Sequence, residues 1–267
     1  MRPLAKFGAL VCIGCQLLNV VVAEPAKEFA FLFIGDTSTL GYLGASQGLI
    51  EANAQGEFLD TVYELRTSPE NETPNFEGLA IVAAVGAQQL MALAQAFSET
   101  AILNISQTES SLRELCFENV FHVASSAAMI ADANRQWQEI NPGSKARAHA
   151  WHESFKKYAA GQLNIRFHNQ FDRKMDDAAW AGWAAVKLLS DTIVRQPTLS
   201  NQGLINELKT NLAFDGQKGV DLSFRETGQL RQPLLLVEGG KVVGEAPVRG
   251  AADPSNLDSL GIEFCAK

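Results

Sequence analysis

The amino-acid sequence predicts an α/β fold with a parallel sheet, followed by a smaller, mainly helical part and a C-terminal β-hairpin. Short apolar runs alternate with helical segments as far as residue 140, and beyond Pro142 the helical pattern dominates. Strands that alternate with helices of about ten or more residues are typical of parallel sheets. Gly239 and Gly240 separate two further apolar runs near the end of the chain, which predicts a tight hairpin turn.

The first half of the chain supplies five predicted strands. The first of them is a continuous apolar run that ends in an acid, a pattern typical of a strand buried on both faces of a parallel sheet. The five strands are predicted at residues 28–36, 61–65, 79–86, 100–106 and 120–126. Helical segments are predicted at residues 41–58, 87–97, 111–116 and 127–140. Gly56 is expected to end the first of these helices.

The second half is expected to be mainly helical before strands return. Residues 144–167 and 201–212 have helical character. Residues 176–194 form the clearest helix, because Asp176 and Asp177 suit its N-terminal dipole. Three short strands are then predicted at residues 220–224, 230–237 and 241–245.

Composition and charge narrow the class of protein. The chain has 267 residues, of which 46% are hydrophobic and 19% charged, as is ordinary for a folded soluble protein. Its formal net charge is −8, and its lysines and arginines form no basic run. Nucleic-acid binding requires a basic face, so the acidic balance argues against that class of function.

Residues 1–23 are predicted to be a secretory signal peptide, so the mature protein is expected in the periplasm. Two basic residues precede an apolar run, and Ala23 stands at the expected cleavage position. The run is short and interrupted by polar residues, which argues against a lasting transmembrane anchor. Lipidation at Cys15 is the alternative. It is disfavoured because Cys12 stands where leucine is usual and apolar sequence continues past Cys15.

Two cysteines remain beyond the predicted signal peptide, Cys116 and Cys265. In an oxidising compartment such a pair is expected to form a disulfide, which would tie the end of the chain to its middle. Two buried thiols are the alternative.

His149 and His152 form the candidate metal motif of the sequence. In a helix this spacing could place two imidazoles on one face. The pair lacks the adjacent glutamate of zinc proteases and an obvious third ligand, so a surface or cleft histidine pair is preferred. A hydrolytic metal site that adds Asp172 or Asp176 is the enzyme alternative. The sequence contains no nucleophile elbow, Walker loop or dinucleotide-binding glycine motif.

Polar side chains follow three of the predicted strands directly, in the segments GDTSTLGY, SQTES and ASS. Open α/β sheets bind ligands in the crevice beyond the carboxyl ends of their strands. Hydroxyl and amide groups at these ends can hydrogen-bond a small solute without chemistry. The alternative is that they only cap helices, because Ser106, Thr108 and Ser126 all stand at N-cap positions.

The segment DTSTLGYLGASQGLIEANAQGEF, residues 36–58, resembles the opening of type I periplasmic solute-binding proteins, the branched-chain amino acid receptor group. Later segments resemble one branch, the ABC-transporter substrate-binding proteins associated with PQQ-dependent alcohol dehydrogenase systems. These segments are residues 102–133, 150–167, 176–187, 214–237 and 257–265. The resemblance implies a Rossmann-like first lobe, and it matches Cys116 and Cys265 to cysteines of the family.

The sequence departs from this family in the length of its second lobe. A second α/β lobe on the order of 100 residues normally follows the segment that ends here at residue 140. Only residues 141–149 separate that segment from the next one that resembles the family. The implied division is therefore an N-terminal α/β lobe, residues 24–140, and a reduced second lobe with the C-terminal strands and tail, residues 141–267.

The resemblance implies a non-enzymatic solute-binding component of an ABC-type importer, without a cofactor, linked to PQQ-dependent alcohol oxidation. Its partners would be a small-molecule ligand, an ABC permease and a periplasmic quinoprotein dehydrogenase. The alternative is an accessory protein of such a dehydrogenase that has lost its cleft. We expect the ligand near Asp36, Thr39, Tyr42, Ser106, Thr108 and Ser125, with Trp151 and His152 closing the far side.

Arg225 and Arg231 stand six residues apart around Gly228 and could form an anion site. The nearby hairpin turns and the distance in sequence from the strand-end loops favour a structural role. We expect both arginines to bind acids or carbonyls that hold the C-terminal strands.

Overall fold

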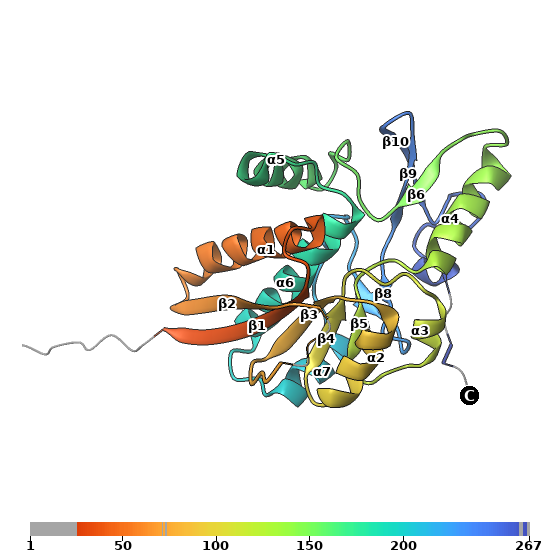
Figure 1. The fold of residues 1–267 in the computed structure, drawn as a ribbon. Helices are drawn as coiled ribbons and strands as arrows, with labels where there is room; N and C mark the ends of the chain where they lie inside the picture. Colours follow the sequence, from red (N-terminus) through yellow and green to blue (C-terminus); the bar gives the residue numbers. More distant parts are fainter. Residues whose placement is uncertain (1–25, 71, 73, 262–263, 266–267) are drawn as a thin grey trace, which may run out of the picture.

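The larger sheet of the computed structural model holds five strands in the order β2-β1-β3-β4-β5 (Figure 1). The structure describes residues 26–70, 72, 74–261, 264 and 265. The strands are β1 (Lys27–Gly35), β2 (Thr61–Ser68), β3 (Ala80–Ala84), β4 (Ala101–Asn104) and β5 (Val120–His122). Each pairs in parallel with its neighbours, so the predicted parallel α/β sheet is confirmed.

Helices cover both faces of this sheet. Phe31 and Phe33 point to one face, and Leu32 and Ile34 point to the other. The first face packs against α1 (Leu40–Gly56), α6 (Asp177–Arg195) and α7 (Asn201–Thr210). The second face packs against α2 (Ala87–Ala96) and the short α3 (Ser111–Glu114). Burial on both faces explains why β1, β3 and β4 contain continuous apolar runs in the sequence.

Helices α1 and α6 pack very closely because glycines lie at their contact. A Cβ atom added to Gly44 would lie 1.9 Å from the carbonyl oxygen of Ala179, and one added to Gly182 would lie 2.0 Å from that of Gly41. The two backbones therefore touch without intervening side chains. Since α6 and α7 follow residue 140, the chain returns to the first sheet after building part of the second region.

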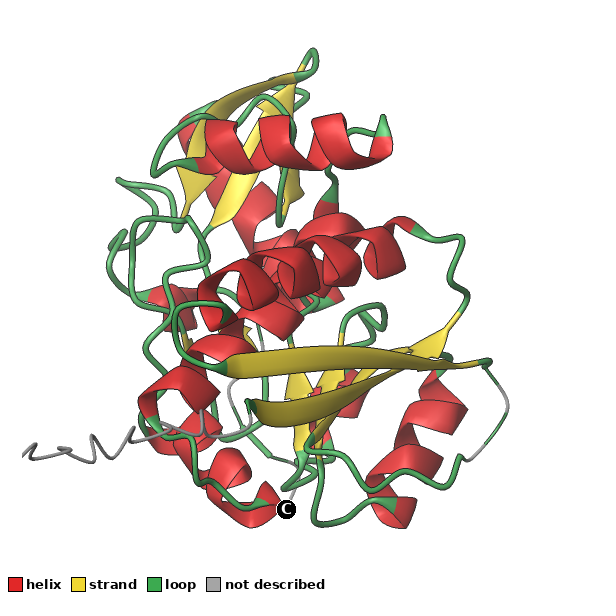
Figure 2. Cartoon of the chain, turned by 90° about the vertical axis from the view of Figure 1, so that its left-hand side faces the viewer, coloured by secondary structure: helices red, strands yellow, loops and turns green. Residues whose placement is uncertain are grey.

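The smaller sheet is antiparallel, has the order β10-β9-β6 and lies at the top of Figure 2. Its strands are β6 (Arg147–His149), β9 (Leu234–Glu238) and β10 (Lys241–Ala246). Helix α4 (Ala127–Ile140) packs on this sheet, and α5 (Ala160–Phe171) follows β6 in the chain. Gly239 and Gly240 both have positive φ in the predicted hairpin turn between β9 and β10.

The prediction of helix over residues 144–167 is wrong in its first part. Residues 147–149 form β6, where Ala148 lies opposite Leu236 of β9, and helix begins only at Ala160. A three-residue strand carries too little periodicity to identify from sequence, and its partner lies far along the chain. The predicted strands over residues 220–237 are shorter than expected and include the small pair β7 (Ser223–Phe224) and β8 (Leu230–Arg231).

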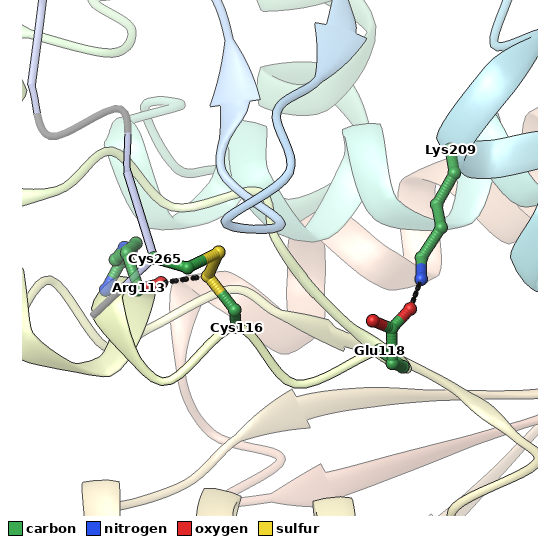
Figure 3. Close-up of a disulfide and its surroundings, with 5 residues drawn as sticks. All are labelled: Arg113, Cys116, Glu118, Lys209 and Cys265. Atoms are coloured by element: carbon green, nitrogen blue, oxygen red, sulfur yellow. Dashed lines mark hydrogen bonds and ion pairs between the residues drawn. A yellow bond between two sulfur atoms is a disulfide. The ribbon is translucent and has the colours of Figure 1, made fainter. Parts of the chain in front are cut away.

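Covalent and ionic contacts fasten the C-terminal region to the larger sheet. The expected disulfide joins Cys116, just after α3, to Cys265 near the end of the chain (Figure 3). Close to it, Lys209 of α7 forms an ion pair with Glu118 (Figure 3). Both contacts bring late segments of the chain to the loop that precedes β5.

The two C-terminal arginines have the structural role that the sequence predicts. The Nε atoms of Arg225 and Arg231 donate to Oδ1 of Asp258 at 2.8 and 2.7 Å. Arg225 also donates to the carbonyl oxygens of Leu257 and Leu260. The carboxylate of Asp258 therefore joins the β7–β8 pair to the C-terminal tail.

The predicted signal peptide, residues 1–23, lies outside the part of the chain that the structure describes. Within the described residues, no helix is long and apolar enough to cross a membrane. The cleavage position after Ala23 stays a prediction.

Candidate functional site

A cavity of about 220 Å³ lies beyond the carboxyl ends of β4 and β5, where the sequence predicts a solute site. We call it the strand-end cavity. Its lining residues come from the loop after β4, the segment between β5 and α4, the first turns of α4 and α6, and the residue that follows β6. They are Ile105, Ser106, Thr108, Ala124, Ser125, Ile130, Ala150, Asp177 and Ala178. The cavity therefore lies between the larger sheet and the segment that leads out of the smaller one.

The loop after β4 is held in place by the buried side chain of Asn104. Its Oδ1 atom accepts hydrogen bonds from the backbone amides of Ser106 and Gln107, at 3.2 and 2.8 Å. The carbonyl oxygen of Thr108 accepts a hydrogen bond from the amide of Ala127 at 2.7 Å, which joins this loop to the start of α4. These contacts place the Ser106 and Thr108 side chains at one side of the cavity.

Ser125 supplies a buried hydroxyl group to the cavity wall. The residue is 5% exposed, and its Oγ atom has no hydrogen-bond partner among the residues that the structure describes. Its neighbour Ser126 differs, because the Oγ atom of Ser126 accepts from the amide of Met129 and caps α4. A buried polar atom without a partner is costly, so the Ser125 hydroxyl is a ready donor or acceptor for a bound molecule.

Asp177 is the charged side chain of the lining, and the sequence did not single it out as a site residue. Its Oδ1 atom accepts from the backbone amide of Trp151 at 2.7 Å, and its Oδ2 atom lies 3.1 Å from Nδ1 of His149. The hydrogen bond to Asp177 raises the pKa of His149 above its ordinary value, against the opposing effect of burial. Asp177 thus holds the segment after β6 against the start of α6.

Three of the eight predicted site residues line the strand-end cavity: Ser106, Thr108 and Ser125. Asp36, Thr39 and Tyr42 lie instead at the end of β1 and the start of α1. Thr39 caps α1, and the backbone and side-chain hydrogen bonds of Ser38 to Asp36 lower the pKa of that carboxyl group.

Tyr42 packs edge-on against Phe33, with the ring centroids 5.0 Å apart. The start of α1 is nevertheless close to the cavity, since a Cβ atom added to Gly41 would lie 3.2 Å from Cδ1 of Ile105.

Trp151, expected to close the far side of the site, is buried and is absent from the lining of the strand-end cavity. Trp151 is 1% exposed, its ring stacks on Trp180 with centroids 6.0 Å apart, and its Nε1 atom donates to Oδ1 of Asn164 at 2.8 Å. It supports the cavity wall from behind. His152 lies in the following loop, where its Nδ1 atom is 2.9 Å from the Ser154 hydroxyl, and burial lowers its pKa.

The two histidines do not have the helical arrangement that a metal motif requires. His149 belongs to β6 and His152 to the loop after it, and their ring centroids are 6.3 Å apart. His149 pairs with Asp177 and not with Asp172 or Asp176. Among the described residues, no group of three or more histidine, cysteine or acidic side chains could hold a metal ion.

Comparison with known proteins identifies the fold. Neither a scan against protein-family models nor a search of curated proteins finds a match to this sequence. A branched-chain amino acid ABC transporter periplasmic ligand-binding protein from Burkholderia xenovorans has a similar structure, with a TM-score of 0.67 and 10% identity over 81% of this chain and 95% of that one.

Two further similar structures contain bound small molecules. A branched-chain amino acid transporter substrate-binding protein from Streptococcus pneumoniae, in complex with isoleucine, has a TM-score of 0.63 and 11% identity over 82% of this chain and 99% of that one. An ABC transporter solute-binding protein from Rhodopseudomonas palustris, in complex with 3,4-dihydroxybenzoic acid, has a TM-score of 0.65 and 9% identity over 82% and 94%. The chain has the fold of type I periplasmic binding proteins.

Proposed function

We propose that the protein is the periplasmic solute-binding component of an ABC-type importer and binds a small molecule with amino acid chemistry, without converting it. The observation that carries the proposal is the strand-end cavity, in which the Ser125 hydroxyl is buried and lacks a partner among the described residues. Ligands commonly bind beyond the carboxyl ends of the strands in open α/β sheets.

The lining of the cavity suits a small molecule that has both polar and apolar parts. The hydroxyls of Ser106, Thr108 and Ser125 can hydrogen-bond a carboxylate or hydroxyl group, and the carboxylate of Asp177 attracts an ammonium group. Apolar side chains that include Ile105 and Ile130 contact the remainder. The bound isoleucine of the Streptococcus pneumoniae protein has this combination of groups, which supports amino acids as the first class to test.

The smaller region is proposed to be a reduced second lobe. It consists of α4, α5 and the three-stranded sheet, and the strand-end cavity lies where its Ala150 approaches Ser125 of the larger region. We also propose a link to PQQ-dependent alcohol oxidation, with a quinoprotein dehydrogenase as a further partner. This link is supported by the sequence resemblance of residues 214–237 and 257–265.

Isothermal titration tests the proposal. Mature protein would be titrated with L-leucine, L-isoleucine, L-valine and 3,4-dihydroxybenzoate. For whichever of the four compounds binds, we expect Ser125→Ala to weaken the affinity about tenfold. One hydrogen bond to a buried group contributes about 1 kcal/mol, and more when the ligand group is charged.

Ser255→Ala is the matched control, since the Ser255 hydroxyl donates to nearby Asp253 in the exposed C-terminal loop, outside the cavity lining. Equal affinities of the Ser125 and Ser255 variants would contradict the assignment of the cavity. Folded protein that binds none of the four compounds, but copurifies with a periplasmic dehydrogenase, would favour the accessory-protein alternative.

A further inference from the structure

A buried lysine lies behind the strand-end cavity, outside its lining. Lys218 is 2% exposed, and its Nζ atom donates to three oxygens: the carbonyl of Ala150 at 2.6 Å, Oε1 of Gln232 at 2.7 Å and the carbonyl of Pro233 at 3.0 Å. A protonated amine has three N–H donors, and each one has an acceptor here. The arrangement is therefore specific for the ammonium form.

The hydrogen bonds of Lys218 continue to the opposite wall of the cavity. The side chain of Gln232, which accepts from Lys218, donates through Nε2 to the carbonyl oxygen of Val123 at 2.9 Å. Val123 immediately precedes Ala124 and Ser125, which line the cavity, and Ala150 lines it from the other side. A continuous path of three hydrogen bonds thus joins the two walls, from Val123 through Gln232 and Lys218 to Ala150.

Aromatic rings stabilise the buried charge at this position. The Nζ atom of Lys218 lies 4.1 Å from the centroid of a Trp180 ring, and Trp180 stacks on Trp151. Trp180 also donates from Nε1 to the carbonyl oxygen of Gly216 at 3.1 Å, which fixes the loop that carries Lys218. A cation over an indole face is attracted more strongly when it is removed from water, as Lys218 is here.

We propose that Lys218, with Gln232, is a positioning residue for ligand binding: its ammonium group fixes the separation of the Ala150 and Ser125 walls of the strand-end cavity. This inference rests on the proposed function as far as the ligand is concerned. The hydrogen-bonded link itself can be tested without a ligand.

The link is expected to weaken as pH rises. Burial lowers the pKa of Lys218 to about 7, and the negative charges of Asp177 on α6 and Glu245 on β10 oppose that effect. Asp177 is paired with His149 and Glu245 with Lys157. A neutral amine has two N–H donors, so one of the three oxygens loses its partner when the proton leaves.

The first experiment follows tryptophan emission of the ligand-free protein between pH 5.5 and 9. We expect a spectral change with a midpoint near pH 7 in the wild type, because Lys218 loses its charge beside Trp180, and no such change in Lys218→Met. His149→Gln is the control for the nearby imidazole and should keep the transition. A transition that persists in Lys218→Met, or disappears in His149→Gln, would overturn the assignment.

The second experiment measures affinity for L-leucine and L-isoleucine at pH 6 and pH 9. We expect the wild type to bind more tightly at pH 6, and Lys218→Met to bind about tenfold more weakly than wild type at pH 6 with no difference between the two pH values. Lys209→Met removes a positive charge that pairs with Glu118 outside the cavity lining, and should behave as wild type. Unchanged affinity in Lys218→Met would refute the positioning role.

A third variant keeps the test decisive if Lys218→Met does not fold. Gln232→Leu breaks the path to Val123 and removes one acceptor of the ammonium group, so it should weaken binding at both pH values and move the emission change to lower pH without abolishing it. If it binds as wild type, the path has no role in positioning. If the wild type binds neither amino acid, the proposed function fails, whereas the emission titration and hydrogen exchange at residues 148–152 still decide whether Lys218 holds the wall.

Discussion

The inner strands β3 and β4 and the second half of β1 are buried on both faces of the five-stranded sheet, whereas β10 at the edge of the three-stranded sheet, like β2 at the edge of the larger one, has exposed positions. Phe31 to Ile34 of β1 are at most 3% exposed, but Val243 of β10 is 45% exposed. Side chains also cover the edges of the smaller sheet. The amide of Ala148 donates to Asn134 of α4, and the amide of Val242 donates to Ser154.

The two sheets nevertheless share one hydrophobic core. Leu234 and Leu236 of β9 belong to the same buried cluster as Phe31 and Phe33 of β1, and Trp151 and Trp180 are among the residues between them. The smaller region therefore depends on the larger one through α6. The strand-end cavity therefore has one wall built by the larger sheet, and a second wall held both by the packing of Trp151 on Trp180 and by the hydrogen bonds of Asp177 and Lys218.

The largest expected effect comes from the α1–α6 contact. Gly44→Ala would place a Cβ atom against the backbone of Ala179, so we expect a loss of about 3 kcal/mol or more in the free energy of unfolding. Because the core is shared, both regions should unfold together. Urea denaturation followed by tryptophan emission measures the free energy of unfolding. Coincidence of that transition with the one seen by far-ultraviolet circular dichroism shows whether the two regions unfold together.

Gly161→Ala in α5 is the matched control for the α1–α6 contact. A Cβ atom there would lie 3.6 Å from Cα of Lys156, an ordinary contact. We expect it to stabilise the protein by about 0.5 to 1 kcal/mol, because alanine favours helix more than glycine does. Similar effects of the two substitutions, or separate transitions of the two regions in Gly44→Ala, would show that α6 does not join the regions as described.

An intermediate effect on stability is expected where Arg225 and Arg231 bind Asp258 of the C-terminal tail. Arg231→Ala removes the hydrogen bonds to Asp258 and to the carbonyl oxygen of Phe224, so we expect a loss of about 1 to 2 kcal/mol in stability. Affinity for a ligand should stay unchanged, because Arg231 is absent from the cavity lining. Thermal denaturation and titration calorimetry check the two parts of this prediction.

Arg66→Ala serves as the comparison for Arg231→Ala. Arg66 pairs with Glu64 on the exposed edge strand β2, and such surface pairs contribute at most about 1 kcal/mol. A greater loss of ligand affinity than of stability in Arg231→Ala would restore the anion-site interpretation.

The smallest effect concerns His149 in β6 and His152 in the loop that follows it. The pKa of His149 is raised in the folded state by Asp177, so its contribution to stability is complete below pH 6.5 and is lost as pH rises through the raised value. We expect His149→Gln to destabilise the protein at pH 5.5 and to have less effect at pH 8. The magnitude is small because both side chains are about two-fifths exposed.

His152 should show the opposite sign. Burial lowers its pKa, so protonation of the folded protein is unfavourable and stability rises with pH through the ordinary titration range of histidine. His152→Gln should therefore reduce this acid sensitivity. Equal pH profiles for the two variants, measured by thermal denaturation, would contradict the different environments of the two imidazoles.

Local patterns in the sequence were sufficient to predict the larger sheet and part of the candidate site. Apolar runs predicted β1 and β3 most directly, since burial on both faces leaves an uninterrupted apolar signal, whereas β2 at the edge of the sheet alternates buried and exposed residues. Ser106, Thr108 and Ser125 were predicted because the carboxyl ends of parallel strands meet at one edge of a sheet. The disulfide between Cys116 and Cys265 and the structural role of Arg225 and Arg231 also agree with the sequence-based expectations.

The missed features depend on contacts between distant segments. Strand β6 forms because Ala148 pairs with Leu236, and Ala150 reaches the cavity as a consequence. Asp177 reaches it because α6 packs on α1. Trp151 was expected on the surface of the site, but its ring packs in the core against Trp180.

By itself, the sequence determined the fold class and the pair of cysteines that join, and it predicted a solute site at the strand ends. Each of these follows from the composition and periodicity of neighbouring residues, or from a pattern typical of exported proteins. The tertiary structure decided that Ala150 and Asp177 line the cavity beyond those strand ends. It also decided that Lys218 lies buried behind Ala150. A single lysine in a turn-rich loop has no distinctive sequence pattern. Its burial and its three acceptors arise only when Ala150, Gln232 and Pro233, which are 68, 14 and 15 residues away in the chain, meet around it.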